Sequence, residues 1–222
     1  LRSHLTASET LFADALTALT LVLIHLRFPL PTLNLVSAVP MIVGGLRIET
    51  ASISGSPVGA DAWWTMSAIA ILGWLWVASI GLRQAGQTAI PESTQREGFR
   101  FAEGIAAILL TMAGFRAATD PWSMVALGCF GVALASLGRW GKLTASPWLS
   151  ILPMAAAVWV AMEQFVASPP ASTLTAMIVT AVLIVLHGVV LCWRFPNRRA
   201  GVWAHGLIAI MLLFPSFASD RI

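Results

Sequence analysis

Long apolar stretches, separated by short polar loops, occupy almost the whole of this chain. Each stretch is roughly 16 to 22 residues long and apolar all round, which is typical of a helix that crosses a membrane. The strands of a membrane barrel would be about ten residues long and would alternate apolar with polar residues, so helices are favoured. We predict eight membrane-spanning helices, at residues 10–26, 31–46, 62–82, 101–117, 121–138, 147–167, 172–193 and 200–217.

The second predicted span, residues 31–46, is the weakest because it contains Pro31, Asn34 and Pro40. We keep open an alternative with seven spans, in which this segment is re-entrant and does not cross the bilayer. Pro153 is expected to bend the sixth span, because proline removes one backbone hydrogen bond. The loops at 47–61 and 83–99 are too short to fold alone. We therefore expect a single transmembrane domain over residues 1–222.

The composition supports a membrane environment. The chain is 58% hydrophobic and 10% charged, and its mean hydropathy is +0.82. A soluble domain carries about 25% charged residues, because its surface faces water. The expected partner is therefore the lipid bilayer, in which backbone amides must be paired within helices or a closed barrel. The predicted fold class is all-α, a polytopic transmembrane helical bundle.

Basic residues indicate the orientation of the predicted spans. The 13 Lys and Arg residues are scattered over the loops, so the net charge of +3 indicates topology and not a nucleic-acid-binding surface. Nine of them fall on one side of the predicted membrane and four on the other. Cytoplasmic loops are the richer in Lys and Arg. Both termini of this segment are then extracytoplasmic, and because the chain begins with Leu1 we expect a fragment of a longer polytopic protein.

Four ionisable side chains fall in the cytoplasmic half of the predicted spans: His25, Glu103, His187 and His205. Polar groups are costly in hydrocarbon, so these four are the candidate intramembrane polar site. If they converge, they would form a proton- or cation-handling site, because imidazole titrates near neutrality and burial shifts a carboxyl toward that range. In the plainer interpretation, each makes one hydrogen bond between helices or reaches the headgroups. Arg100, one turn before Glu103, is its expected helix-pairing partner.

The sequence shows no catalytic, cofactor-binding or metal-binding motif, and no cofactor is expected. The G-x-S-x-G spelled by residues 55–59 contains a proline and follows no predicted strand, so we regard it as a coincidence. Cys129 and Cys192 have no metal or redox spacing and are expected to be packing residues. Packing is also expected of the tryptophans deep in their spans, Trp74, Trp76 and Trp159.

Residues 96–140 contain an Arg, an apolar helix with Gly104, then Asp120 and a Gly-rich helix. Residues 198–220 echo this pattern, with Gly206 again eight residues after an Arg. This arrangement resembles the repeated helix pairs of very large predicted bacterial membrane proteins of unknown function. The resemblance covers about a third of the chain. It implies a fragment in a bacterial cytoplasmic membrane and carries over no catalytic residue.

Three function classes follow from this sequence. The first is a non-enzymatic structural or scaffolding membrane module, and the second is a transporter or channel for a small solute or ion. The third, an enzyme acting on lipid or glycan, has the least support because no nucleophile or acid–base pair stands out. A water-filled cavity lined by the four polar residues would favour the transporter, and a dry, close-packed interior would favour the scaffold. The sequence identifies no protein partner.

Overall fold

The computed structural model describes residues 6–28, 33–53, 62–84, 92–117, 121–140, 146–166, 171–194, 205–206 and 208–209. All of the elements formed within these ranges are helices, so the prediction of an all-α fold is confirmed. They are α1 (Ala7–Arg27), α2 (Leu33–Val36), α3 (Ala38–Ile53), α4 (Ala62–Gln84), α5 (Glu92–Ala117), α6 (Trp122–Trp140), α7 (Ser146–Leu149), α8 (Ile151–Val166) and α9 (Ala171–Arg194).

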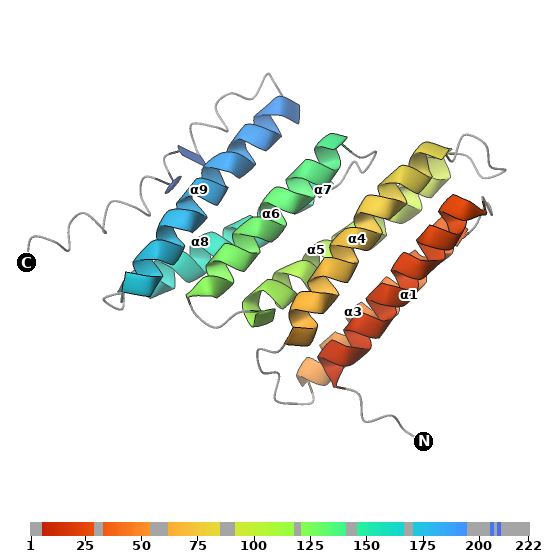
Figure 1. Ribbon diagram of the computed structural model, residues 1–222, viewed down its shortest axis with the longest axis horizontal. Coiled ribbons are helices and arrows are strands. Elements are labelled where there is room, and N and C mark those ends of the chain that lie inside the picture. The colour runs from red at the N-terminus through yellow and green to blue at the C-terminus, as the bar shows by residue number, and fades with distance from the viewer. Residues whose placement is uncertain are drawn as a thin grey trace, which may run out of the picture.

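The long helices form two layers (Figure 1). Helices α1, α4, α6 and α9 lie in the front layer and run in the same direction, whereas α3, α5 and α8 lie behind them and run the opposite way. In the front layer α1 packs against α4, and α6 packs against α9, while α5 contacts both α4 and α6 from behind. The chain therefore reverses direction between consecutive long helices, as consecutive spans would.

Three helices are long and apolar enough to cross a membrane, by length and composition: Ala7–Arg27, Ala62–Gly81 and Ala171–Cys192. Two more, Leu33–Arg47 and Trp122–Leu137, are apolar but shorter. Helix α5 is 26 residues long, but several charged residues lie in its first half. Eight spans, and the seven-span alternative for 31–46, stay predictions, and most of 200–217 lies outside the described residues.

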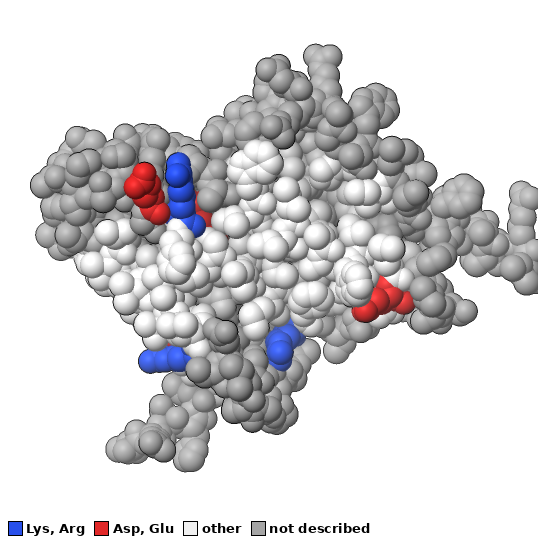
Figure 2. Space-filling view, turned by 180° about the vertical axis from the view of Figure 1, so that it is seen from behind, with Lys and Arg blue, Asp and Glu red and all other residues white. Residues whose placement is uncertain are grey.

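Much of the described surface is apolar. Figure 2 shows the face opposite to that of Figure 1, on which the few charged groups lie towards the margins of a broad uncharged area. Large apolar side chains such as Ile69, Phe101, Ile108 and Val182 are exposed. On a protein surrounded by water, apolar surface of this extent would promote association. The structure is thus consistent with a membrane-associated protein.

The tryptophans in mid-helix do not all pack inside. Trp74 is 0% exposed, but Trp76 is 47% and Trp159 is 63% exposed, so the expectation of interior packing is wrong for the last two. Residues two apart on a helix do not share a face, so Trp74 and Trp76 cannot both face the interior. Cys129 is also exposed and Cys192 only half-buried. Depth along a span does not determine which way a side chain faces.

Two helix breaks differ from the expected continuous spans. Where spans were expected at 31–46 and 147–167, the structure has a four-residue helix (α2 or α7), then a turn at Ser37 or Ser150, then a 16-residue helix (α3 or α8). In each case proline, Pro40 or Pro153, follows the serine by three residues. Proline is well tolerated in the first turn of a helix, where the backbone N–H has no intrahelical partner. The sequence predicted a bend at Pro153, but the structure starts a new helix just before it.

These breaks belong to an internal repeat. Ser37, Pro40 and Met41 recur as Ser150, Pro153 and Met154, at a constant offset of 113 residues (150 − 37). Each copy contains a long helix, the short helix, the 16-residue helix and a second long helix. The same offset relates the buried positions of α1 and α6, which are Leu11, Ala15, Ala18 and Val22 in one and Met124, Gly128, Gly131 and Ala135 in the other. We call α1–α4 the first repeat and α6–α9 the second.

Glycine allows α5 and α6 to approach closely at Gly114. A Cβ atom at this position would lie 2.6 Å from Cδ2 and 2.9 Å from Cγ of the buried Leu127. We expect Gly114→Ala to lower the free energy of unfolding by about 1–3 kcal/mol, because a packed side chain must shift. A Cβ at Gly104, on the same helix, would meet nothing within 4 Å. Gly104→Ala is expected to raise that free energy by up to about 1 kcal/mol, through helix propensity.

The unfolding midpoint of each glycine variant is measured by thermal unfolding in detergent, followed by circular dichroism, and compared with that of the wild type. Opposite signs are expected for the two changes in midpoint. Equal changes would contradict the close approach of α5 and α6 at Gly114.

Candidate functional site

Glu103 holds the start of the short helix α7. Its side chain, on α5, is 2% exposed. Its Oε2 accepts hydrogen bonds from the backbone N–H of Ser146, at 2.7 Å, and from the Ser146 hydroxyl, at 2.8 Å. Ser146 is the first residue of α7, and N–H groups at a helix start lack partners within the helix. Glu103 therefore fastens α7 of the second repeat to α5.

A hydrogen-bonded chain begins just after α7. The Ser150 hydroxyl donates to the Pro147 carbonyl at 2.6 Å and lies 2.9 Å from Nε2 of His187 on α9. Nδ1 of His187 lies 3.1 Å from Nε2 of His205, and the two rings are tilted at 45°. Ser150 and His187 are fully buried, whereas His205 is half-buried. The chain thus leads from the interior to a partly accessible imidazole.

The bond from Ser150 to Pro147 fixes the direction of the other two. A hydroxyl has one proton, so Ser150 can only accept from Nε2 of His187. The Nδ1 atom of a neutral His187 then accepts the proton of His205 Nε2. Gly188 permits this contact, because a Cβ atom there would lie 2.9 Å from Cβ and Cγ of His205. In this arrangement every nitrogen of His187 has a partner.

The first repeat has an equivalent contact with a different partner. Nε1 of Trp74 donates to the Ser37 hydroxyl at 3.0 Å, and this hydroxyl donates to the Asn34 carbonyl at 2.6 Å. In both repeats the aromatic partner lies 37 residues after the serine, and the carbonyl three residues before it. Trp74 also stacks on Phe99, with ring centroids 5.5 Å apart. His187 therefore occupies the position of Trp74 and donates to the serine as Trp74 does.

His25 lies in the first repeat, apart from the residues around α7. It is buried near the C-terminal end of α1. A Cβ atom on Gly81 of α4 would lie 3.2 Å from its Cδ2 and 3.2 Å from Nδ2 of Asn34. The structure thus brings His187 and His205 into contact, puts Glu103 at the other end of α7, and puts His25 beside Asn34.

Arg100 and one ion pair between helices are the other charged groups to be placed. Arg100 is exposed whereas Glu103 is buried, and their pairing stays a prediction. Asp14 on α1 forms a 3.1 Å ion pair with the exposed Arg47 on α3. Such a pair contributes at most about 1 kcal/mol where water reaches it. The Arg47–Asp14 pair thus joins α3 to α1.

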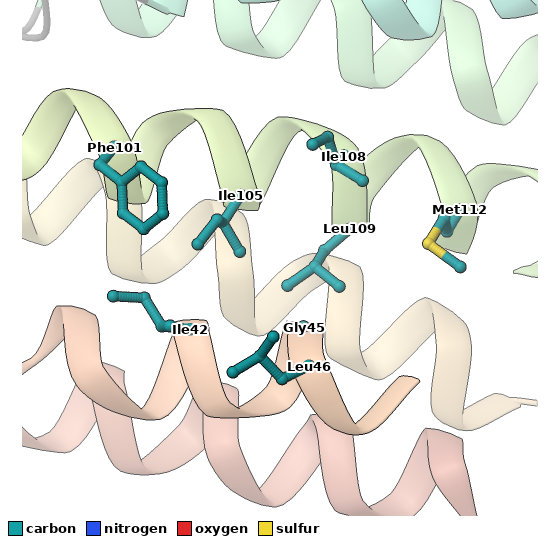
Figure 3. Close-up of a pocket in the computed structure, with 8 residues that line it drawn as sticks. All are labelled: Ile42, Gly45, Leu46, Phe101, Ile105, Ile108, Leu109 and Met112. Atoms are coloured by element: carbon teal, nitrogen blue, oxygen red, sulfur yellow. The ribbon is translucent and has the colours of Figure 1, made fainter. Parts of the chain in front are cut away.

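Two apolar pockets lie between helices. One, of about 420 Å³, lies between α3 and α5, and its lining side chains are shown in Figure 3. The other, of about 430 Å³, lies between α4 and α6 and includes Gly73 and Trp76. None of the four candidate polar residues lines either pocket, and the surface that these pockets offer is mainly apolar.

In the part of the chain that the structure describes, no three His, Cys, Asp or Glu side chains are grouped so as to hold a metal ion. The G-x-S-x-G segment, 55–59, lies outside the described residues. Comparisons with protein-family models, with curated proteins and with solved structures give no match to this chain. The resemblance to large bacterial membrane proteins therefore stays a prediction.

Proposed function

We propose that the chain is a multi-pass integral membrane protein that acts as a non-enzymatic structural or scaffolding module. Its eight spans comprise three in each repeat, one at 101–117 between the repeats, and one at 200–217 after the second repeat. It resides in a bacterial cytoplasmic membrane, with both termini of this segment outside. The three long apolar helices and the exposed apolar side chains support the membrane location.

The structural role is supported by the buried polar side chains, which form hydrogen bonds between helices. Glu103, Ser150 and His187 are buried, and each bonds to a group on another helix or turn. Hydrogen bonds between helices hold membrane bundles together, because lipid offers no alternative partner. Ser150 gives its proton to a carbonyl, so it is not arranged as a nucleophile with His187 as its base. Cross-linking of helices is the role that this geometry fits.

A transporter or channel is the second candidate, and one observation favours it. The chain Ser150–His187–His205 links a buried hydroxyl to a half-buried imidazole. Imidazoles that exchange a proton through such a chain are used in membrane proton relays. In that case the His pair, and not the apolar pockets, would be the conducting element.

Reconstituted vesicles separate the two candidates. The full chain is placed in liposomes containing a pH-sensitive dye, and proton leak is measured after a pH jump, beside the double variant His187→Gln, His205→Gln. For a structural module we expect equal leak in wild type, variant and empty vesicles, and a lower unfolding midpoint for the variant. A leak in the wild type that the variant abolishes would favour the transporter. Release of the protein from membranes by alkaline carbonate alone would contradict the membrane location.

A further inference from the structure

The first and second repeats meet where α4 lies beside α6. Side chains of both helices line the groove of about 430 Å³ between them. The lining residues are Ile69, Leu72, Gly73 and Trp76 on α4, and Ala133, Ser136 and Leu137 on α6. We call this set the seam. Leu137 is only 4% exposed, so α6 is covered on the side that faces the seam.

The repeat places an equivalent of each seam residue at an outer edge of the molecule. At the offset of 113 residues, the equivalents are Val182, Val185, Leu186 and Val189 on α9, and Thr20, Leu23 and Ile24 on α1. We call the first set the α9 edge and the second set the α1 edge. Helices α9 and α1 lie at opposite ends of the front layer (Figure 1). Each edge therefore corresponds to one half of the seam.

The edge residues are open where their seam equivalents are covered. Ile24 is 41% exposed, whereas its equivalent Leu137 is 4% exposed. Leu186 is 44% exposed, whereas its equivalent Gly73 is half-buried. The Thr20 hydroxyl donates to a carbonyl of its own helix at 2.8 Å, so this side chain offers its methyl group to a neighbour. In the part of the chain that the structure describes, neither edge has the helix that covers the same positions at the seam.

A second copy of the chain is the partner that covers both edges. Exposed apolar side chains cost little in hydrocarbon, so their exposure alone indicates no partner. The seam, however, is an interface that this sequence already forms, and α9 and α1 carry its two halves. Helices α1, α4, α6 and α9 run in the same direction (Figure 1). Two copies with α9 beside α1 therefore have the same orientation in the bilayer, as copies inserted in the same way have.

We propose that the α9 edge of one copy packs against the α1 edge of a second copy in the membrane, as α4 packs against α6. This inference rests on the proposed membrane location, and it gives the scaffolding module a way to assemble. Close packing of side chains drives the association of helices in lipid. The contact joins two different surfaces, so repeated contacts form a ring or an open chain of copies.

Cysteine cross-linking in membranes tests the proposal. Cys129 and Cys192 are replaced by alanine, and Ile24→Cys and Leu186→Cys are then made in separate copies with different tags. After a carbonate wash, the membranes are treated with a short bismaleimide cross-linker. We expect a dimer that carries both tags when the two variants are co-expressed, and none from either variant alone, which has one reactive edge only.

The outcomes of this experiment are distinct. Release of the protein by the carbonate wash would contradict the membrane location on which the inference rests. Retained protein without the mixed dimer overturns the docking of α9 on α1 and leaves the membrane location standing. Dimers formed as readily by one variant alone, or a cross-link to a protein of another mass in place of the mixed dimer, also overturn it.

Two tryptophan variants on α1 show whether the contact is specific to the edge. Thr20→Trp, added to the Ile24→Cys copy, enlarges the α1 edge, so we expect several-fold less mixed dimer. Leu16→Trp is the control, because Leu16 is exposed and its equivalent, Cys129, is exposed and lies outside the seam. This control should leave the yield of mixed dimer unchanged. Equal yields from the two tryptophan variants overturn the proposed packing.

Discussion

Trp74→Ala is expected to lower the free energy of unfolding by about 3–5 kcal/mol, the range typical of removing a large buried aromatic side chain. Trp74 is fully buried, stacks on Phe99 and donates to Ser37. The alanine leaves a cavity between α4 and α5 and removes one partner of the serine that ends α2. Chemical unfolding in detergent, followed by circular dichroism, measures the loss.

Trp76 provides the matched control for this substitution. It lies two residues later on α4 and is 47% exposed. Trp76→Ala is expected to change the free energy of unfolding by less than about 1 kcal/mol, because surface substitutions leave no cavity. Trp74→His, which copies the residue of the second repeat, should fall between the two by keeping a donor for Ser37. Equal losses for Trp74→Ala and Trp76→Ala would mean that α4 is oriented differently.

The helices were predictable from hydropathy, but their starts were not. The first span was expected from residue 10, and α1 begins at Ala7, where Thr6 and Glu9 form a capping box. Likewise α5 begins at Glu92, well before the expected residue 101. Polar residues satisfy the free N–H groups of a first helical turn, so they lower the hydropathy where the helix in fact begins.

The breaks at Ser37 and Ser150 were missed for a related reason. A serine inside an apolar stretch barely changes its mean hydropathy, yet its hydroxyl can bond to a preceding carbonyl and end a helical turn. The available signal was the recurrence of Ser-x-x-Pro-Met at a fixed offset, which marks the repeat. The similarity predicted between residues 96–140 and 198–220 does not have the 113-residue offset of this repeat. Its second copy lies largely outside the described residues.

The candidate site was predictable only in part. His25 lies in the last turn of α1 and His187 in the C-terminal half of α9, and these two helices run in the same direction (Figure 1). The sequence gives the position of a residue along its own helix, but which residues of other helices it contacts depends on how the helices pack. His25 belongs to the first repeat, and the other three lie around α7 of the second. Asn34 was noted only as a weakness of its span.

The two repeats place the same serine in different surroundings. In the first, the indole of Trp74 can only donate a proton, so its bond to Ser37 is fixed in direction. In the second, Nε2 of His187 can change from donor to acceptor if the Ser150 hydroxyl turns away from the Pro147 carbonyl and donates to it instead. The repeat thus has an invariant serine turn and a variable aromatic partner. Only the second copy therefore has an aromatic partner whose ring can both donate and accept a proton.

Glu103→Ala is expected to lower the free energy of unfolding by about 2–4 kcal/mol, because it leaves the buried N–H of Ser146 without its acceptor. Glu103→Gln retains an acceptor oxygen and should lose about half as much. Glu163, which is exposed on α8, is the control, and its replacement by Ala should change stability by less than about 0.5 kcal/mol.

A double-mutant cycle with Ser146→Ala then isolates the hydroxyl bond of Glu103. Ser146→Ala removes the 2.8 Å hydroxyl contact and leaves the 2.7 Å backbone contact in place. We expect a coupling energy of about 1 kcal/mol between the two substitutions, since contacting residues are not additive. Strict additivity would show that the Ser146 hydroxyl does not interact with Glu103, whereas the backbone contact is tested by the loss in Glu103→Ala alone.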